Sequence, residues 1–373
     1  MASEPAVSSP ASPPPELSAP VPLPPAPAAR RDKPRAPAAG DDKLSPPAED
    51  KVPHIALLLP LSSKAFGRHA EAVNDGFLAA AKVHGDAALP VRAYATGDDP
   101  EQVVKTYIKA VNAGARIVVG PLTRDGVTAI AGSAAVLVPT LALNVPEGRL
   151  DPLSGIYVLS LQIEAEARQV AQLAYQEGFR KVITINGDTP LLKRIHQAFV
   201  EEFTRLGGAH VIAYDFTTDP EYLARIRTVA SGGSVDTAFL ALDFTRARLA
   251  RPYLGALPVY ATSQVHSGNT GPLIGYDLAG VRFLDMPWLL QPDHPAVMVY
   301  PRPGFRGDVE LDRFYALGID AFRIALTLLS GRADAALDGV TGRLTLSRDH
   351  QFARGLTTAQ FADGKLTVVR ERP

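Results

Sequence analysis

The sequence predicts an α/β protein of two doubly wound parallel-sheet lobes with a central cleft. Short apolar runs suited to buried strands alternate with longer stretches of helical periodicity. Because parallel strands need long crossover connections, usually helices, this alternation predicts parallel sheets. The alternation restarts after a loop at 144–155. About ten strands in two such runs indicate two sheets rather than one.

The first run of elements begins at His54. The segment His54–Leu59 is apolar throughout, which is typical of a strand buried on both faces. Asp99 and Pro100 suit the N-cap and the first position of a helix, and Gly114 suits its end. The elements expected here are strands at 54–59, 91–95, 116–120 and 140–143, and helices at 68–84, 100–113 and 123–135.

The second run repeats the pattern after the loop. Helices are expected at 164–177, from Leu192 to Leu206 and after Asp219-Pro220, and strands at 181–186, 210–216, 237–242 and 259–261. A long helix at 311–330 follows, and then short antiparallel strands at 343–346, 355–361 and 365–369. Asp363-Gly364 lies between the last two strands and favours a two-residue hairpin turn.

Residues 1–53 are predicted to be a disordered Pro/Ala-rich tail or linker. The first 50 residues hold 14 of the 33 prolines and no aromatic residue. Such a segment cannot bury enough apolar surface to offset the entropy of ordering it. We expect a spacer that is dispensable for the folding of residues 54–373.

The composition excludes several classes of function. The net charge of −1, from 38 basic and 39 acidic residues, gives no electrostatic reason to expect a nucleic acid partner. The absence of cysteine excludes disulfides, thiolate catalysis and cysteine-ligated metals. No apolar stretch reaches the roughly 20 residues of a spanning helix. The first residues lack the pattern of an export signal.

The common enzymatic motifs are absent from the sequence. It has no His-Glu-x-x-His, no Gly-x-Ser-x-Gly and no phosphate-binding glycine loop. The eight histidines are scattered, without the paired spacing of a metal site. We therefore expect no enzymatic activity, no cofactor and no metal.

Four stretches resemble the type I periplasmic binding proteins, the fold of leucine-binding proteins. They are Ile55–Ser62 and Asn74–Ala80, similar to the first strand, cleft loop and helix, Ile117–Thr123, similar to a strand and loop on the cleft wall, and Gly318–Arg323, similar to a late helix. They occur in the family's order, so the resemblance implies that fold for residues 54–373.

Within that class, the chain is most similar to the lipoprotein activators of penicillin-binding proteins, the LppC/LpoA type. The matching stretches are Val119–Leu122, Pro139–Asn144 and Leu337–Leu344. That family often carries an N-terminal helical-repeat domain, and in this chain the tail occupies that position.

The resemblance implies a non-enzymatic activator of a peptidoglycan synthase, a class A penicillin-binding protein. It also implies a periplasmic location and tethering to the outer membrane through a lipid anchor; we expect neither the export signal nor the lipidated cysteine in this chain. The alternative is a solute receptor of an ABC transporter, which binds an amino acid or a similar small polar ligand. The long tail favours the activator, because a spacer is useful to an anchored protein.

The fold implies two lobes and three crossings. We expect one lobe at about 54–157 and 289–332, and the other at about 158–288 and 333–373. The crossings are expected near 154–161, 285–288 and 330–337.

Candidate cleft residues lie where strands end, since ligands of such folds bind at the carboxyl ends of parallel strands. A hydroxyl or an open backbone amide there could receive a carboxylate at a helix N-terminus. The alternative is that these side chains only cap helices and satisfy loop amides. The candidates are Ser62, Ser63, Leu122, Thr123, Asn144, Ser160, Gln162, Asp243, Thr262, Ser263 and Asp285.

Overall fold

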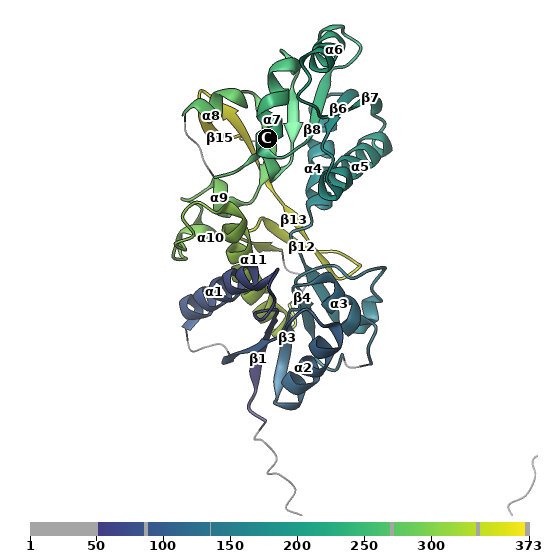
Figure 1. Ribbon diagram of the computed structural model, residues 1–373. Helices are drawn as coiled ribbons and strands as arrows, with labels where there is room; N and C mark the ends of the chain where they lie inside the picture. Colours follow the sequence, from purple (N-terminus) through teal and green to yellow (C-terminus); the bar gives the residue numbers. More distant parts are fainter. Residues whose placement is uncertain (1–50, 86–88, 135, 269–271, 333–335, 370–373) are drawn as a thin grey trace, which may run out of the picture. The chain divides into compact units, whose positions relative to one another are not determined.

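The computed structural model describes residues 51–85, 89–134, 136–268, 272–332 and 336–369. The predicted disorder of the tail falls on residues 1–50, which lie outside the described residues. The described chain forms two sheets with helices on both faces of each, so the predicted fold class is confirmed (Figure 1).

The first sheet has the strand order β11-β12-β13-β5-β4-β3-β1-β2. The strands from β13 to β2 are parallel, and β12 and β11 are antiparallel additions at one edge. Its members are β1 (His54–Leu59), β2 (Val91–Ala95), β3 (Ala115–Val119), β4 (Thr140–Ala142), β5 (Ile156–Leu159), β11 (Leu337–Asp338), β12 (Arg343–Leu346) and β13 (Gln351–Gly355).

The second sheet has the order β15-β14-β10-β9-β8-β6-β7, with β10 to β7 parallel and β14 and β15 antiparallel. Asp363 and Gly364 both have positive φ and join the last two strands, as predicted. Its members are β6 (Lys181–Asn186), β7 (Ala209–Asp215), β8 (Thr237–Ala241), β9 (Val259–Ala261), β10 (Val281–Asp285), β14 (Thr357–Ala362) and β15 (Lys365–Val368).

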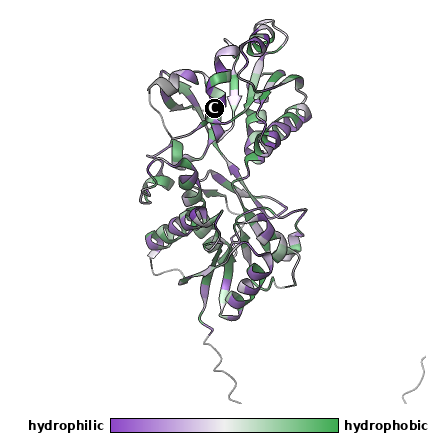
Figure 2. Cartoon of the chain, viewed as in Figure 1, coloured by the Kyte–Doolittle hydropathy of each residue, from purple (hydrophilic) through white to green (hydrophobic). Residues whose placement is uncertain are grey.

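Helices cover both faces of each sheet, which explains why the central strands are apolar throughout (green in Figure 2). In β1, Ile55, Leu57 and Leu59 pack toward α1 (Gly67–His84) and α11 (Val309–Leu329). Ala56 and Leu58 pack on the other face, in the cluster that includes residues of α2 (Pro100–Asn112) and α3 (Arg124–Ala131).

The second sheet is covered in the same way. One face packs against α4 (Ile163–Gln176) and α5 (Pro190–Arg205), and the other against α6 (Pro220–Ser231) and α7 (Phe244–Ala250). The remaining short helices are α8 (Pro272–Asp277), α9 (Pro287–Leu290), α10 (Pro295–Met298) and the 3-10 turns η2 (Pro152–Ser154), η3 (Arg251–Leu254) and η4 (Ser263–Val265).

Two glycines bring α1 and α11 into backbone contact. A Cβ at Gly76 would lie 1.9 Å from the carbonyl oxygen of Tyr315, and a Cβ at Gly318 would lie 2.1 Å from that of Val73. The two helices pack closely only because these positions carry no side chain.

Asp320 joins two of the stretches that carry the family resemblance, 318–323 and 337–344. This fully buried carboxylate accepts hydrogen bonds from the backbone N–H groups of Val340 (3.0 Å) and Thr341 (2.7 Å) and from the Thr341 hydroxyl (2.7 Å). The 318–323 stretch therefore holds the turn within 337–344, a segment that is remote in sequence.

The last crossing and the last lobe boundary differ from the prediction. Residues 337–355, expected in the second lobe, lie in the first sheet, where β13 runs parallel to β5. The chain crosses near Leu356, between β13 and β14, and not at 330–337. The expected strand at 355–361 spans the last residue of β13 and most of β14, because apolar periodicity does not mark which sheet a residue joins. The rest of the division into lobes stays our proposal.

Candidate functional site

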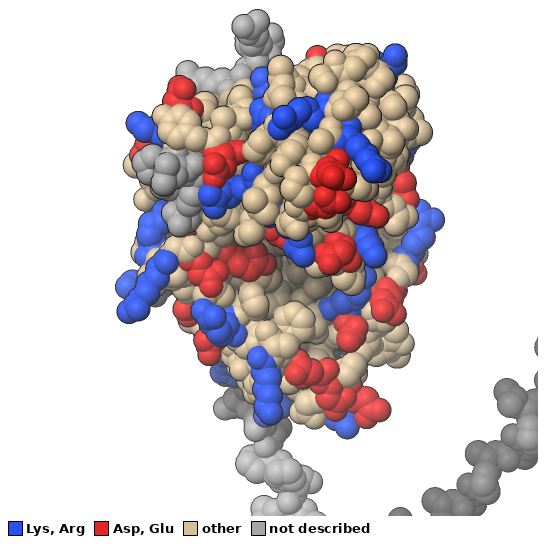
Figure 3. Space-filling view, turned by 45° about the horizontal axis from the view of Figure 1, so that its top comes forward, with Lys and Arg blue, Asp and Glu red and all other residues tan. Residues whose placement is uncertain are grey.

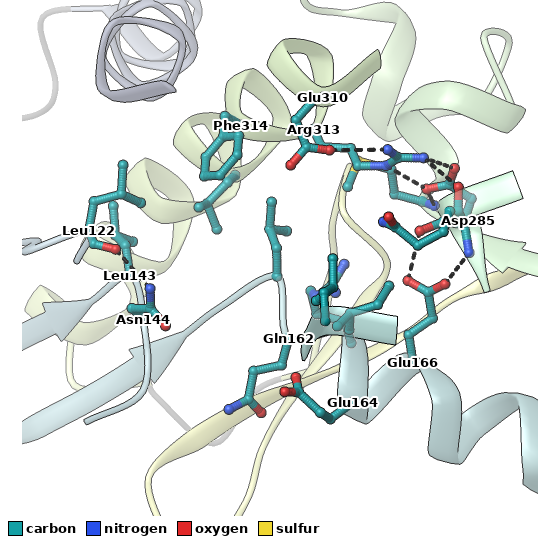
Figure 4. Close-up of a pocket in the computed structure, with 18 of the residues that line it drawn as sticks. Leu122, Leu143, Asn144, Gln162, Glu164, Glu166, Asp285, Glu310, Arg313 and Phe314 are labelled. Carbon is teal, nitrogen blue, oxygen red and sulfur yellow. Dashed lines mark hydrogen bonds and ion pairs between the residues drawn. The ribbon is translucent and has the colours of Figure 1, made fainter. Parts of the chain in front are cut away.

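A cavity of about 510 Å³ lies between the carboxyl-terminal ends of strands from the two sheets. Its lining comes from the loops after β3 and β4, the start of α4, the end of β10 and the first half of α11 (Figure 4). The volume is within the range of small-molecule sites.

The structure brings together five of the predicted residues and leaves six outside the cavity lining. Those that line it are Leu122, Asn144, Gln162, Ser263 and Asp285. Those that do not are Ser62, Ser63, Thr123, Ser160, Asp243 and Thr262.

Three of the outlying residues cap helices or turns, which is the alternative role that we considered. The Ser63 hydroxyl accepts the Phe66 N–H (2.9 Å), and the Thr123 hydroxyl accepts the Gly126 N–H (3.3 Å). Asp243 caps α7 and forms an ion pair with Arg246. These contacts occupy the polar atoms, so position at a strand end alone does not identify a ligand-binding group.

The cavity wall on the side of the first sheet is apolar. Leu122 and Leu143 follow β3 and β4, and Phe314 and Leu317 line the cavity from α11. Asn144 adds little free polarity there, because its amide donates to the Leu122 carbonyl (3.0 Å) and accepts the Val145 N–H (2.9 Å).

A buried ion pair forms the deepest polar part of the opposite wall. The Arg313 guanidinium on α11 donates to Asp285 Oδ2 at the end of β10 (2.8 Å), and His266 Nδ1 lies 2.9 Å from the same oxygen. Burial alone would raise the pKa of Asp285, but the Arg313 charge and the His266 hydrogen bond outweigh burial and lower it to about 2. Arg313 also donates to the Ser263 carbonyl (3.2 Å), which links α11 to the second sheet.

Glu166 on α4 completes this wall from below (Figure 4). Its carboxyl group accepts hydrogen bonds from the backbone N–H and the hydroxyl of Ser263. Burial and then the nearby Asp285 charge raise the pKa of Glu166 to about 7. The pKa values of these two adjacent carboxyl groups therefore lie far apart, because only Asp285 is paired with a cation.

Arg354 on β13 lies beside the first crossing, which follows β5, and just before the last crossing near Leu356. Its Nε donates to the Ser160 carbonyl at the first crossing (3.0 Å), and its Nη1 donates to the Thr341 carbonyl (3.4 Å). Within the described chain it has no ion pair with a carboxylate. Burial lowers its pKa from the ordinary arginine value.

The rim of the cavity carries exposed charges. Arg194 on α5 pairs with Glu164 on α4 (2.7 Å), and Glu310 reaches Arg313 (3.4 Å). Basic and acidic side chains are interspersed over the face shown in Figure 3. The rim therefore presents both signs of charge.

The sequence interpretation missed the three charged residues that organise the polar wall: Glu166, Arg313 and Arg354. One signal was available. Arg313 lies four residues before Leu317 and seven before Asp320, so it shares the buried stripe of α11, where a charged residue needs a partner. Glu166 carries a similar signal, because it lies four residues before Val170 and eight before Ala174 on the buried stripe of α4, whereas the short strand of Arg354 carries none.

The described residues contain no group of three or more His, Cys, Asp or Glu side chains placed to hold a metal ion. None of their helices is both long enough and apolar enough to cross a membrane.

Comparisons with known proteins were made for the whole chain. The family described as "LppC putative lipoprotein" matches residues 42–231 and 233–364. Among curated proteins, the penicillin-binding protein activator LpoA of Klebsiella pneumoniae is 27% identical over 329 residues, which is 75% of this chain and 46% of the relative. The chain thus spans about half the length of the curated relatives it matches.

Two solved structures are informative. The LpoA C-domain of Haemophilus influenzae, a regulator of PBP1A, matches with a TM-score of 0.72 and 24% identity, over 85% of this chain and all of that one. A Chromobacterium violaceum structure described as a "putative branched-chain amino acid ABC transporter" matches with a TM-score of 0.71 and 39% identity, over 83% of this chain and all of that one. The fold is that of the type I periplasmic binding proteins, and the family match over most of the chain shows that the protein belongs to the LppC lipoprotein family.

Proposed function

We propose that this protein is a non-enzymatic activator of a class A penicillin-binding protein, held in the periplasm at the outer membrane by a lipid anchor. The observation that carries the proposal is the family match over 42–231 and 233–364, together with the curated relatives named as activators of penicillin-binding proteins. A protein contact, and not chemistry in the cavity, would then be the function.

The acidic groups of the cavity support the non-enzymatic part of the proposal. Asp285 is held by Arg313 and His266, and Glu166 by Ser263. Glu164 and Glu310 are paired with arginines. A general base needs a lone pair within reach of a substrate proton, and each of these carboxylates already has at least one oxygen bonded to a protein donor.

The bonds of Arg313 support a fixed scaffold. Arg313 lies on α11, which packs on the first sheet, and it donates to the Ser263 carbonyl and to Asp285 of the second sheet. A receptor that closes on its ligand must rearrange such contacts, whereas a protein that presents a surface to a synthase benefits from keeping them.

The test uses the whole chain and the periplasmic part of the bifunctional synthase from the same organism. We expect saturable binding in biolayer interferometry and a faster rate of peptidoglycan synthesis. A matched solution of the heat-denatured chain serves as the control. Absence of both binding and stimulation would refute the activator role.

The second candidate is a solute receptor of an ABC transporter. The 39% identity to the Chromobacterium violaceum structure favours it, as does the cavity itself. At a hundredfold excess over the dissociation constant, a ligand stabilises the folded state by about 2.7 kcal/mol, which is a melting shift of several degrees. A shift of this size with a free amino acid, in the absence of synthase binding, would favour the receptor.

A further inference from the structure

A second pocket, of about 330 Å³, opens at the amino-terminal edge of the second sheet. It lies where α6 ends and where the chain runs from η3 into β9, whereas the cavity described above lies at the carboxyl-terminal ends of the strands. The two share no lining residue. The walls of this second pocket are mainly apolar and include Ala230, Tyr253, Leu254, Ala256, Leu257 and Pro258.

The charged side chains at this pocket are basic. Arg227 is the charged residue of the lining, and its guanidinium carbon lies 5.0 Å from the centre of the Tyr253 ring. Arg251 donates to the carbonyl oxygen of Gly255, a lining residue (2.9 Å), and to that of Ala279 (2.9 Å). Among the described residues neither arginine pairs with a carboxylate, and no Asp or Glu lines the pocket. The pocket therefore combines an apolar surface with positive charge that lacks an acidic partner.

The fold fixes the walls of this pocket. Leu254 is buried, and Tyr253 and Leu257 pack against the core of the second sheet. The Leu257 N–H donates to the Leu254 carbonyl (3.2 Å) and closes the turn between them. In that turn Gly255 has a φ of 55°, a conformation that favours glycine. A pocket that is already formed loses little conformational entropy when a partner binds.

The rim of the pocket is exposed, which favours a protein over a small molecule as its occupant. Arg227, Ser231, Gly255 and Ala256 all lie in contact with solvent. A small molecule would keep much of its surface in water here, whereas sites for small molecules bury most of the ligand. A partner protein would cover the pocket and the rim together. Arginine and tyrosine are also among the residue types that contribute most to the binding energy of protein interfaces.

We propose that this pocket is a docking site for the penicillin-binding protein. It receives one leucine or phenylalanine side chain of that partner, and a carboxylate next to this side chain binds Arg227. The volume of about 330 Å³ suits one large side chain and is too small for a helix, which is about 10 Å wide with its side chains. A guanidinium held over an aromatic ring can bind a carboxylate through two parallel hydrogen bonds. The identity of the partner rests on the proposed function, and the chemistry of the docked segment rests on the pocket.

The first test reverses the charge of Arg227. Binding of the periplasmic part of the synthase to the full chain is measured by biolayer interferometry. Arg227→Glu should weaken this binding at least tenfold, because it replaces the cation that meets the partner's carboxylate. Arg225→Glu is the matched control, since it makes the same change of charge at an exposed position of the same helix that does not line the pocket. It should change the dissociation constant less than twofold.

The second test blocks the apolar part of the pocket. Ala256→Trp places an indole ring where the partner's side chain would enter, so it should also weaken binding at least tenfold. Ala93→Trp, at an exposed position of β2 in the first sheet, adds the same group elsewhere and should leave binding unchanged. Circular dichroism and thermal melts establish that each variant is folded. Because both alanines are exposed, we expect both variants to fold.

The outcomes separate this inference from the proposed function. If the unaltered chain binds the synthase and neither Arg227→Glu nor Ala256→Trp weakens that binding, the docking site is wrong and the activator role stands. Equal weakening by Arg225→Glu and Arg227→Glu would also overturn the docking site, because only net charge would then matter. No binding by the unaltered chain would refute the activator role and this occupant together. Sedimentation equilibrium tests the other occupant: a dimer of the unaltered chain that Arg227→Glu dissociates would assign the pocket to a second copy, against the proposal.

Discussion

The floor and the rim of the cavity each hold an arginine–carboxylate pair at nearly the same distance. Arg313 and Asp285 lie 2.8 Å apart on the floor, and their side chains are 10% and 2% exposed. Arg194 and Glu164 lie 2.7 Å apart on the rim and are 52% and 21% exposed. The two pairs have nearly the same distance. Any difference in their contributions to the free energy of unfolding must therefore come from their different exposure to solvent. Removing one partner leaves an unpaired buried charge only on the floor.

The largest effect is expected from breaking the floor pair. Arg313→Met should lower the free energy of unfolding by about 3–5 kcal/mol, because Asp285 is then left buried without its cation. Urea denaturation at pH 7 measures this. The double change Arg313→Met with Asp285→Asn removes the stranded charge as well, and should recover at least half of the loss. A single variant as stable as the unaltered chain would show that the floor pair is no different from a surface pair.

A steric change in the same helix sharpens the comparison, because it alters no charge. Gly318→Ala places a methyl group 2.1 Å from the Val73 carbonyl oxygen, so α1 and α11 must separate. Overpacking of this kind lowers the free energy of unfolding by about 1–3 kcal/mol. The higher helix propensity of alanine offsets part of this cost. Gly97→Ala is the control, since a Cβ there meets nothing within 4 Å. Equal melting temperatures of the Gly318→Ala and Gly97→Ala variants would contradict the close packing of α1 and α11.

The sequence predicted α11 and its packing but not its charged partner. A helix was expected at 311–330, and its apolar residues Leu317 and Phe322 lie in the core. The ion pair stayed hidden because Asp285 belongs to β10, and only the fold brings the end of that strand to Arg313. Arg354 was missed for another reason: it precedes the expected strand at 355–361, and no strand was expected at 351–354, where β13 joins the first sheet. Strand periodicity fixes which faces are buried and does not fix which sheet a strand joins.

Five candidate residues were found at the cavity because parallel strands expose their carboxyl ends at one edge. The same rule selected Ser63 and Thr123, whose hydroxyls accept backbone N–H groups of the turn before α1 and of the first turn of α3 instead. The rule locates the edge of the sheet, but it does not distinguish a cap from a ligand-binding group. That distinction depends on which N–H group is nearest, which is a property of the folded loop.

The pH dependence of stability should come from the floor and not from the rim. Because folding raises the pKa of Glu166 from 4.5 to about 7, the folded chain keeps a proton between these pH values that the unfolded chain has released. Its contribution to stability is therefore fully present below about pH 4.5 and is lost as the pH rises through 7. Asp285 contributes in the opposite sense, since its lowered pKa stabilises the fold above about pH 4 and this is lost toward pH 2.

The test compares Glu166→Gln with the unaltered chain. The variant cannot ionise, so its stability relative to the unaltered chain should increase by on the order of 1 kcal/mol between pH 6 and pH 8. Urea denaturation at both values provides the difference. Glu201→Gln, on the exposed face of α5, is the control and should show no such change. A constant difference between Glu166→Gln and the unaltered chain would mean that Glu166 is ionised throughout this range.

The smallest effect is expected at the rim. Arg194→Ala removes the cation of an ion pair whose members are both in contact with solvent, so Glu164 is rehydrated and not stranded. The free energy of unfolding should fall by less than about 0.5 kcal/mol, the usual worth of an exposed pair. Because salt screens exposed charges, even this difference should disappear in about 1 M sodium chloride, where the screening length is roughly 3 Å. The loss caused by Arg313→Met should persist at the same salt concentration, since the buried pair is out of reach of the ions. A loss at Arg194 as large as that at Arg313, or an Arg313 loss that salt abolishes, would mean that burial does not separate these two pairs.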